Sequence, residues 1–360
     1  MDAVLSPFSR KHPRRRLLVG LGAVATLGLA GLAARPWRTA EAGPWVIEGP
    51  TMGTSYTVKI ATPGLGPARL ERVQADIHDA FTAIDQRMSV YLPQSELSRL
   101  NAQPAGRLAV SPALFEVLDA ASEIARLSAG AFDPTIAPVA DAWGFGPSRS
   151  RELPSAATLE EKRRTVGHAG LGLDPATRTV LKAQDGLALD LGGIAKGKGA
   201  DAAASALLAA GVEDFMVEAG GEIVTRGLNA EGRPWAIGIE EPDTWPRRAR
   251  LVLASSNEAI ATSGDYRLYV EHGGRRYPHA IDPATATPIG PGLASVSVIT
   301  GDAMHADALA TALLVQGLER GLRLADQLGL EAHFISRDAG GRLLDHPSAA
   351  RRERRAGQPA

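Results

Sequence analysis

The chain has 360 residues, with 39 Lys and Arg, 40 Asp and Glu, and a formal net charge of −1. This balance excludes a protein that coats nucleic acid, because such proteins carry a large positive excess. With 44% hydrophobic and 22% charged residues, the composition also excludes a largely disordered chain and one with many membrane spans. The sequence contains no cysteine, so thiol nucleophiles, disulfides, thiolate zinc sites and a lipoprotein anchor are excluded.

The first 42 residues have the pattern of an export signal. Basic residues at 14–16 precede an uncharged Leu/Ala/Gly run over 17–34, and small residues at 40–42 form a cleavage pattern. Arg14 and Arg15 before an apolar run are typical of the twin-arginine route, which exports folded proteins. We therefore expect the body of the protein to lie in the periplasm. The alternative to cleavage is a retained single anchor, because the run approaches the roughly 20 residues that span a bilayer.

The chain after the leader alternates short strands with helices. Turn residues around Gly49 separate two predicted strands at 45–48 and 54–60. Apolar residues spaced by three and four predict a helix over 70–88, and Ser111 followed by Pro112 predicts the start of a second helix that ends before Gly130. Further strands are expected at 187–191, 215–219, 222–226, 235–240, 251–254 and 294–300, and further helices at 196–210 and 303–328.

This mixture predicts an α+β fold with mixed, largely antiparallel sheets and packed helices. We expect one domain over residues 43–340, with a long surface loop at 146–158 that is rich in Pro, Arg and Ser. The end of the chain is basic and has no apolar periodicity, so residues 341–360 are expected to form a disordered basic tail.

A glycine-rich segment at 190–199 leads from a predicted strand into a predicted helix. Bare backbone N–H groups and the helix dipole favour a phosphate at such a turn. The spacing nearly matches a P-loop, but Gly199 stands where the magnesium-holding hydroxyl belongs, which argues against an exported NTPase. The alternative is a glycine turn that only packs tightly.

Asp307 and Thr311 are four residues apart in a predicted helix, so their side chains share one face. One carboxylate and one hydroxyl suit Mg²⁺, which keeps several waters and binds substrate phosphates. The alternative for Asp307 is a carboxylate that only interacts with the helix dipole.

His279 lies in one of two polar clusters, at 262–267 and 277–283, between predicted strands. An imidazole titrates near neutral pH and can take a proton from an alcohol, so His279 is a candidate general base. The alternative is a structural histidine that is hydrogen-bonded to the backbone.

The order of these segments resembles the ApbE family, the FAD:protein FMN transferases. The resemblance covers about residues 45–335 and rests on the blocks 51–54, 88–91, 95–101, 130–135, 143–146, 190–197, 262–267, 279–283 and 306–311. Two positions depart from the family pattern. Lys198 replaces a tyrosine that is frequent there, and Ala286 replaces the usual glycine.

The resemblance implies that FAD binds in a cleft between sub-domains. FMN would pass from FAD to a Thr or Ser hydroxyl of a partner protein, and AMP would be released. It also implies that the Gly193 carbonyl, Asp307 and Thr311 hold Mg²⁺, and that His279 assists the acceptor hydroxyl. The implied FAD contacts are Met52, Tyr91, Ala131, Phe132, Asp133, Asp190 and Lys196.

Some members of the family have other roles, so two alternatives stay open. The protein could be an FAD-binding accessory protein or an FAD pyrophosphatase that serves a periplasmic respiratory complex. In each case we expect no nucleic-acid partner, and contact with a membrane only through the leader or the acceptor.

Replacing both Arg14 and Arg15 by lysine should retain a fused reporter in the cytoplasm, because the twin-arginine route reads this pair. N-terminal sequencing of the exported wild-type protein should give a start at Gly43. A start at Met1 with membrane retention would instead indicate an anchor. Unimpaired export of the double variant would contradict the twin-arginine route.

Overall fold

The computed structural model describes residues 4–5, 44–150 and 152–357. The predicted export signal lies outside these ranges, apart from Val4 and Leu5. Within them, no helix combines the length and the hydrophobicity needed to cross a membrane.

The described helices are distributed along the whole chain. They are α1 (Pro67–Met88), α2 (Glu96–Asn101), α3 (Pro112–Leu127), α4 (Ala137–Ala142), α5 (Ala156–Arg163), α6 (Ala195–Ala209), α7 (Ala303–Gln327) and α8 (Ala349–Gly357), with a 3₁₀ turn at His168–Gly170. The start of α5 shortens the loop that was predicted at 146–158. The helices predicted at 70–88, 196–210 and 303–328 are confirmed as α1, α6 and α7.

A central antiparallel sheet organises the fold. In spatial order it contains β18 (Leu343–Pro347), β17 (Glu331–Arg337), β16 (Leu293–Thr300), β11 (Ala259–Gly264), β8 (Glu222–Arg226), β7 (Phe215–Ala219), β3 (Thr54–Ile60) and β2 (Trp45–Thr51). Every neighbouring pair in this sheet is antiparallel, which confirms the predicted α+β class.

Smaller sheets surround the central one. They are β4 (Gly106–Ala109) with β6 (Thr179–Lys182) and β5 (Leu171–Asp174); β9 (Trp235–Glu240) with β10 (Ala249–Ser255); β14 (Ile281–Asp282) with β15 (Thr287–Pro288); and β1 (Val4–Leu5) with β12 (Tyr269–His272) and β13 (Arg275–Pro278).

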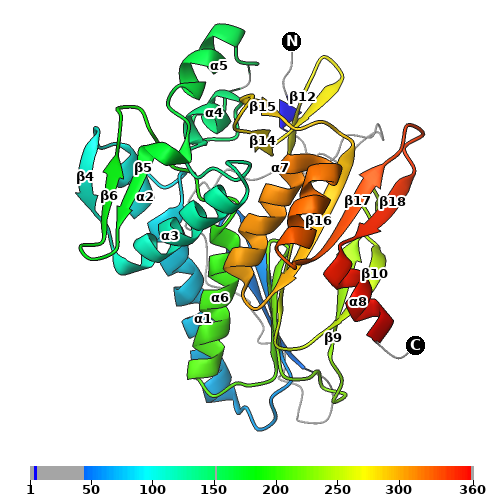
Figure 1. Cartoon of the computed structure of the whole chain (residues 1–360). Helices are drawn as coiled ribbons and strands as arrows, with labels where there is room; N and C mark the ends of the chain where they lie inside the picture. Colours follow the sequence, from blue (N-terminus) through cyan, green and yellow to red (C-terminus); the bar gives the residue numbers. More distant parts are fainter. Residues whose placement is uncertain (1–3, 6–43, 151, 358–360) are drawn as a thin grey trace.

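The two faces of the central sheet are covered differently. Helices α1, α6 and α7 lie side by side on one face (Figure 1). Phe215 and Val217 of β7 point into this helical layer, whereas Met216 between them packs with Trp235 and Ile237 of β9 on the opposite face. The alternation along β7 follows from the two-residue period of a strand. The site described below lies where α6 and α7 begin, at one end of the helical layer.

The prediction of a strand at 187–191 is wrong. Its alternating leucines are buried, but Leu189 exchanges hydrogen bonds with the side chain of Asn101, at 2.8 Å in each direction. The amide of Asp190 donates to the carbonyl of Pro134 at 2.8 Å, and only an isolated bridge links Ala188 to Ile136. The segment is extended because loops and one side chain hold it, without a neighbouring strand.

The prediction of a disordered tail is wrong for residues 343–357, which form β18 and α8. Strand β18 pairs with β17 at the edge of the central sheet. Arg351 contacts Glu331 at 2.7 Å, and Arg354 contacts Glu331 at 2.8 Å and Glu258 at 2.6 Å. The basic run is ordered because it pairs with Glu331 of β17 and with Glu258, which immediately precedes β11.

Glycines allow α6 to approach both α7 and the β2–β3 hairpin closely. A Cβ atom on Gly197 would collide with the carbonyl of Ala303 and lie 2.9 Å from the Cα of Met304. A Cβ atom on Gly199 would lie 2.6 Å from the Cε of Met52. A side chain at Gly199 would require Met52 and Phe81 to move, so packing favours the glycine that breaks the P-loop pattern.

We expect Gly197→Ala to lower the free energy of unfolding by about 1–3 kcal/mol, the usual range for overpacking. Alanine favours a helix over glycine by about 1 kcal/mol, but here the methyl group would meet backbone that cannot move independently. Gly301→Ala is the matched control, because a Cβ atom there has no protein atom within 4 Å. Urea denaturation measures both, and equal stabilities of the two variants would contradict the contact.

Candidate active site at the start of helices α6 and α7

Lys196 forms the centre of a buried charged cluster. From the first turn of α6, its Nζ lies 3.2 Å from Oδ1 of Asp307 and 3.1 Å from Oε1 of Glu222. Both carboxylate side chains are only 2% exposed. Burial opposes the charged form of Lys196, but the two carboxylates outweigh this effect and raise its pKa. The ammonium group is therefore charged at neutral pH and is held between two carboxyl groups.

Glu222, the first residue of β8, was missed by the sequence analysis. It follows Gly220 and Gly221, and a Cβ atom on Gly220 would lie 3.3 Å from the Cδ of Lys196, so this glycine leaves room for the lysine. Burial raises the pKa of Glu222. Its Oε2 is buried without a hydrogen-bond partner among the described residues. One indication of a functional role for Glu222 was present in the sequence: it is an acidic residue after a pair of glycines, at the start of a buried strand.

The structure brings together the three residues that were predicted to hold magnesium. The amide of Gly197 donates to Oδ2 of Asp307 at 3.1 Å, which fixes this carboxylate at the start of α6. Thr311 lies one turn further along α7, and its Oγ1 is 3.0 Å from Oγ of Ser263. A Cβ atom on Gly193 would lie 3.1 Å from the same Oγ1. Their role as metal ligands stays a prediction.

The chemistry of these groups fits a divalent cation with few protein ligands. No cluster of three or more His, Asp or Glu side chains within the described ranges could hold a metal. Mg²⁺ commonly binds one or two carboxylates and completes its shell with waters and substrate phosphates. The unpartnered Oε2 of Glu222 is compatible with additional positive charge at this point.

His279 lies between β13 and β14, as the sequence predicted, and faces the same region as Lys196. Its Nδ1 is 3.2 Å from the carbonyl oxygen of Leu268, and its ring meets the edge of Phe145 with centroids 6.4 Å apart. The surrounding protein reduces hydration of the protonated ring, and the charge of Lys196 adds to this, so the pKa of His279 is lowered to about 4. The ring is therefore neutral at pH 7.

The hydrogen bond also sets the tautomer of the neutral ring. A carbonyl oxygen only accepts hydrogen bonds, so Nδ1 of His279 carries the hydrogen that it donates to Leu268. The lone pair then resides on Nε2. Solvent can reach the side chain, so a bound alcohol could approach this nitrogen.

The predicted FAD contacts lie on several loops around this cluster. Met52 occupies the tight β2–β3 turn with φ 43° and packs against α6. The ring of Phe132 would be 3.2 Å from a Cβ atom on Gly193. Tyr91 donates from its hydroxyl to the carbonyl of Phe145 at 2.5 Å. Burial and the nearby charge of Asp190 raise the pKa of Tyr91.

Asp133 has a structural role that the sequence did not indicate. Its Oδ1 accepts from the amide and the hydroxyl of Thr135, at 2.8 and 2.6 Å, and its Oδ2 accepts from the amide of His168 at 2.8 Å. Ala131 lies in the same turn, where its amide donates to the carbonyl of Ser128. The carboxylate of Asp133 is occupied by the loop, so a ligand contact here would use the backbone.

The two departures from the family pattern have local explanations. Lys198 forms an ion pair with Glu116 of α3 at 2.6 Å. Ala286 has φ 54°, in the left-handed region, which explains why glycine is usual at this position. Its carbonyl accepts from the indole nitrogen of Trp143 at 2.9 Å, which holds the turn in place.

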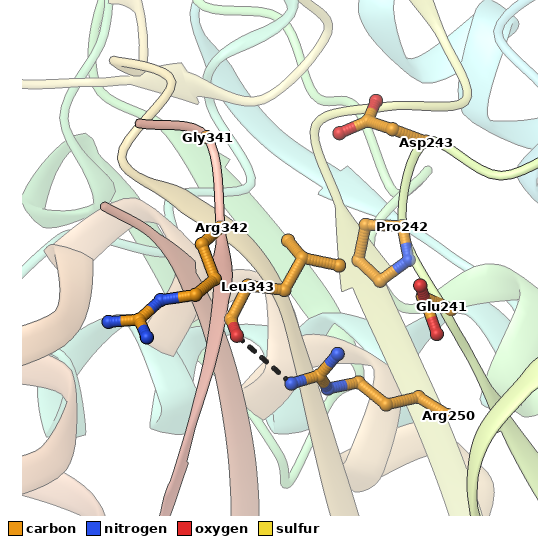
Figure 2. A pocket seen from close by; sticks show the side chains of 7 residues that line it. All are labelled: Glu241, Pro242, Asp243, Arg250, Gly341, Arg342 and Leu343. Carbon is orange, nitrogen blue, oxygen red and sulfur yellow. Dashed lines mark hydrogen bonds between the residues drawn. The ribbon is translucent and has the colours of Figure 1, made fainter. Parts of the chain in front are cut away.

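A separate hollow of about 380 Å³ lies between the segment after β9 and the start of β18. Figure 2 shows its lining, in which Arg250 donates to the carbonyl of Leu343 at 3.1 Å. The guanidinium also pairs with Asp345 at 2.5 Å. None of the predicted site residues lines this hollow.

Comparisons with known proteins agree on one family. The sequence model of the ApbE family matches residues 52–334. The chain is 40% identical over 283 residues to a FAD:protein FMN transferase of Vibrio cholerae, covering 78% of this chain and 84% of that protein. It is 38% identical over 309 residues to a FAD:protein FMN transferase of Haemophilus influenzae, covering 84% of this chain and 89% of that protein.

Solved structures give the same result. The flavin transferase ApbE from Vibrio cholerae superposes with a TM-score of 0.78 at 36% identity, covering 86% of this chain and 98% of that one. The apo form of the Pseudomonas stutzeri flavinyl transferase ApbE gives a TM-score of 0.77 at 36% identity, covering 86% and 96%.

Proposed function

The chain belongs to the ApbE family, and we propose that it transfers FMN from FAD to a Thr or Ser hydroxyl of an acceptor protein and releases AMP. The chain matches two FAD:protein FMN transferases at 38–40% identity, and each match covers most of the relative's length. The structural observation that carries the proposal is the charged cluster of Lys196, Asp307 and Glu222 in the same region as the neutral ring of His279. We also propose that the reaction takes place in the periplasm.

The pyrophosphate of FAD would lie at the start of α6. Backbone N–H groups at a helix N-terminus favour an anion, and Lys196 adds a full positive charge from the first turn. Met52, Tyr91 and Phe132 offer apolar and aromatic surface around this point. FAD bound in this way would bring the phosphorus of its FMN half towards α7 and His279.

Gly193, Asp307 and Thr311 would hold Mg²⁺ through a carbonyl, a carboxylate and a hydroxyl oxygen. When bound, Mg²⁺ neutralises charge on the pyrophosphate and on the departing phosphate. Lys196 is within reach of both Asp307 and Glu222, so it keeps a carboxylate partner if Asp307 turns to a cation.

His279 would accept the proton of the acceptor hydroxyl at Nε2. The hydroxyl oxygen attacks the phosphorus of the FMN half and forms the new P–O bond. The bond from that phosphorus to the bridging oxygen breaks, and AMP leaves with the electron pair. The atoms balance, because one acceptor hydroxyl and FAD give the FMN ester, AMP and one proton.

Asp307→Ala should abolish both AMP release and flavinylation, because it removes the one carboxylate among the proposed Mg²⁺ ligands. AMP release from FAD is followed by chromatography, with and without a candidate acceptor domain, and FMN on the acceptor is detected by mass spectrometry. Glu116→Ala, which removes only the partner of Lys198, is the control and should leave turnover unchanged. Full turnover of Asp307→Ala in EDTA would contradict the magnesium assignment.

His279→Asn should lower the transfer rate by about 10²–10⁴-fold, the usual range for loss of a general base, with FAD affinity unchanged. In the wild-type protein the base is active when neutral, and its pKa is lowered to about 4. The rate should therefore be constant from neutral pH down to about pH 5 and should fall as pH drops through about 4. Loss of FAD binding with an unchanged rate per bound flavin would make His279 a binding residue.

A further inference from the structure

A cavity of about 590 Å³ lies beside the candidate active site and contains none of the proposed FAD contacts. Asp282, Thr285 and Thr287 of the β14–β15 hairpin form one wall, and Leu314, Val315 and Leu318 of α7 form the other. We propose that this cavity receives the hydroxyl-bearing segment of the acceptor protein. The inference rests on the proposed FMN transfer and identifies where its second substrate enters.

The α7 residues in the cavity wall extend the helix face that carries the proposed metal ligands. Residues three and four positions apart on a helix share a face, so Leu314 and Val315 follow Thr311 on the side that it occupies. With a rise of about 1.5 Å per residue, Val315 lies about 6 Å further along the helix axis. The lining at Val315 therefore lies one helical turn from Thr311, one of the proposed metal ligands.

The opposite wall is close in sequence to His279, the proposed base. Asp282 follows His279 by three residues, which span at most about 10 Å of extended chain. The two walls thus lead to the two groups that an acceptor hydroxyl must meet, the base on one side and the metal-binding face of α7 on the other. Met52, Tyr91 and Phe132 are not part of the lining, so a substrate that enters here would not compete with the proposed FAD contacts.

The charges of the lining disfavour a nucleotide phosphate as the occupant. Arg337 uses each of its five N–H groups, donating to Asp265 at 2.7 and 2.8 Å, to Asp243 at 2.7 and 2.9 Å, and to the carbonyl of Pro291 at 2.9 Å. It has no donor left for a phosphate. The other ionisable group in the lining is Asp282, whose negative charge repels one. The cavity therefore suits an uncharged polypeptide segment.

The backbone of the cavity leaves room for a second main chain. A Cβ atom on Gly290 or Gly292 would meet no protein atom within 4 Å. On the α7 side, Gly317 has φ 75° and ψ 176°, so the helix is interrupted within the lining. The hydroxyl groups of Thr285 and Thr287 hydrogen-bond to each other at 2.8 Å, and their oxygens can still accept from a bound chain. An extended segment with small side chains around its Thr or Ser matches these features.

The test fills the cavity without changing the FAD site. Gly292→Trp and, independently, Gly290→Trp place an indole in the lining, and neither glycine needs a positive φ. Gly301→Trp is the matched control, since that glycine is equally open but does not line the cavity. The probe is a recombinant acceptor domain that the wild-type protein labels with FMN, and the Kd of FAD is measured by flavin fluorescence. Thermal melting verifies that each variant folds.

We expect both cavity variants to raise the KM for the acceptor about tenfold or more, equivalent to about 1.4 kcal/mol of lost binding. The Kd of FAD should stay unchanged, and Gly301→Trp should behave as wild type. If one cavity variant does not fold, the other decides the test. An unchanged KM, or a KM that rises together with the Kd of FAD, would overturn the inference. Failure of the wild-type protein to label any acceptor would instead contradict the proposed function.

Discussion

The close approach of α6 to the start of α7 is the constraint on which the site depends. Gly197 has no side chain, so its amide reaches the carboxylate of Asp307 at 3.1 Å and the preceding Lys196 reaches the same carboxylate. The carboxylate of Asp201 strengthens this junction by accepting from the amides of Ala303 and Met304, both at 2.9 Å. A larger side chain at Gly197 would separate the helices and with them the ammonium and carboxylate groups.

Because this cluster is buried, its charges interact strongly. In water these charges would be screened, but inside the protein an ionised Glu222 is costly unless an ion or a hydrogen bond compensates it, which is why burial raises its pKa. The cluster is thereby suited to a divalent cation and to the anionic pyrophosphate that accompanies it. The neutral His279 lies at the edge of the same region, where its low pKa keeps it unprotonated. The proposed FAD contacts and the proposed acceptor cavity are formed by different elements of the chain.

The sequence predicted elements whose signals are local and missed features that tertiary contacts create. The apolar stripe of α1 and the strands β7, β8 and β9 were found from periodicity alone, and the four-residue spacing placed Asp307 and Thr311 on one face. Glu222 was missed because strand pairing, and not sequence proximity, brings it to Lys196. Residues 187–191 alternate like a strand but are held by Asn101. The tail was predicted as disordered because its acidic partners, Glu258 and Glu331, lie far away in the sequence.

Asp307 is proposed to hold a divalent cation against the FAD pyrophosphate, and this contact can be measured directly. Mn²⁺ can replace Mg²⁺ as a spectroscopic probe, and ³¹P electron–nuclear double resonance on the protein with FAD and Mn²⁺ reports whether the bound ion contacts phosphate. We expect phosphorus couplings in the wild-type complex and their loss in Asp307→Asn, with FAD still bound. The same couplings at the same Mn²⁺ affinity in Asp307→Asn would contradict the claim.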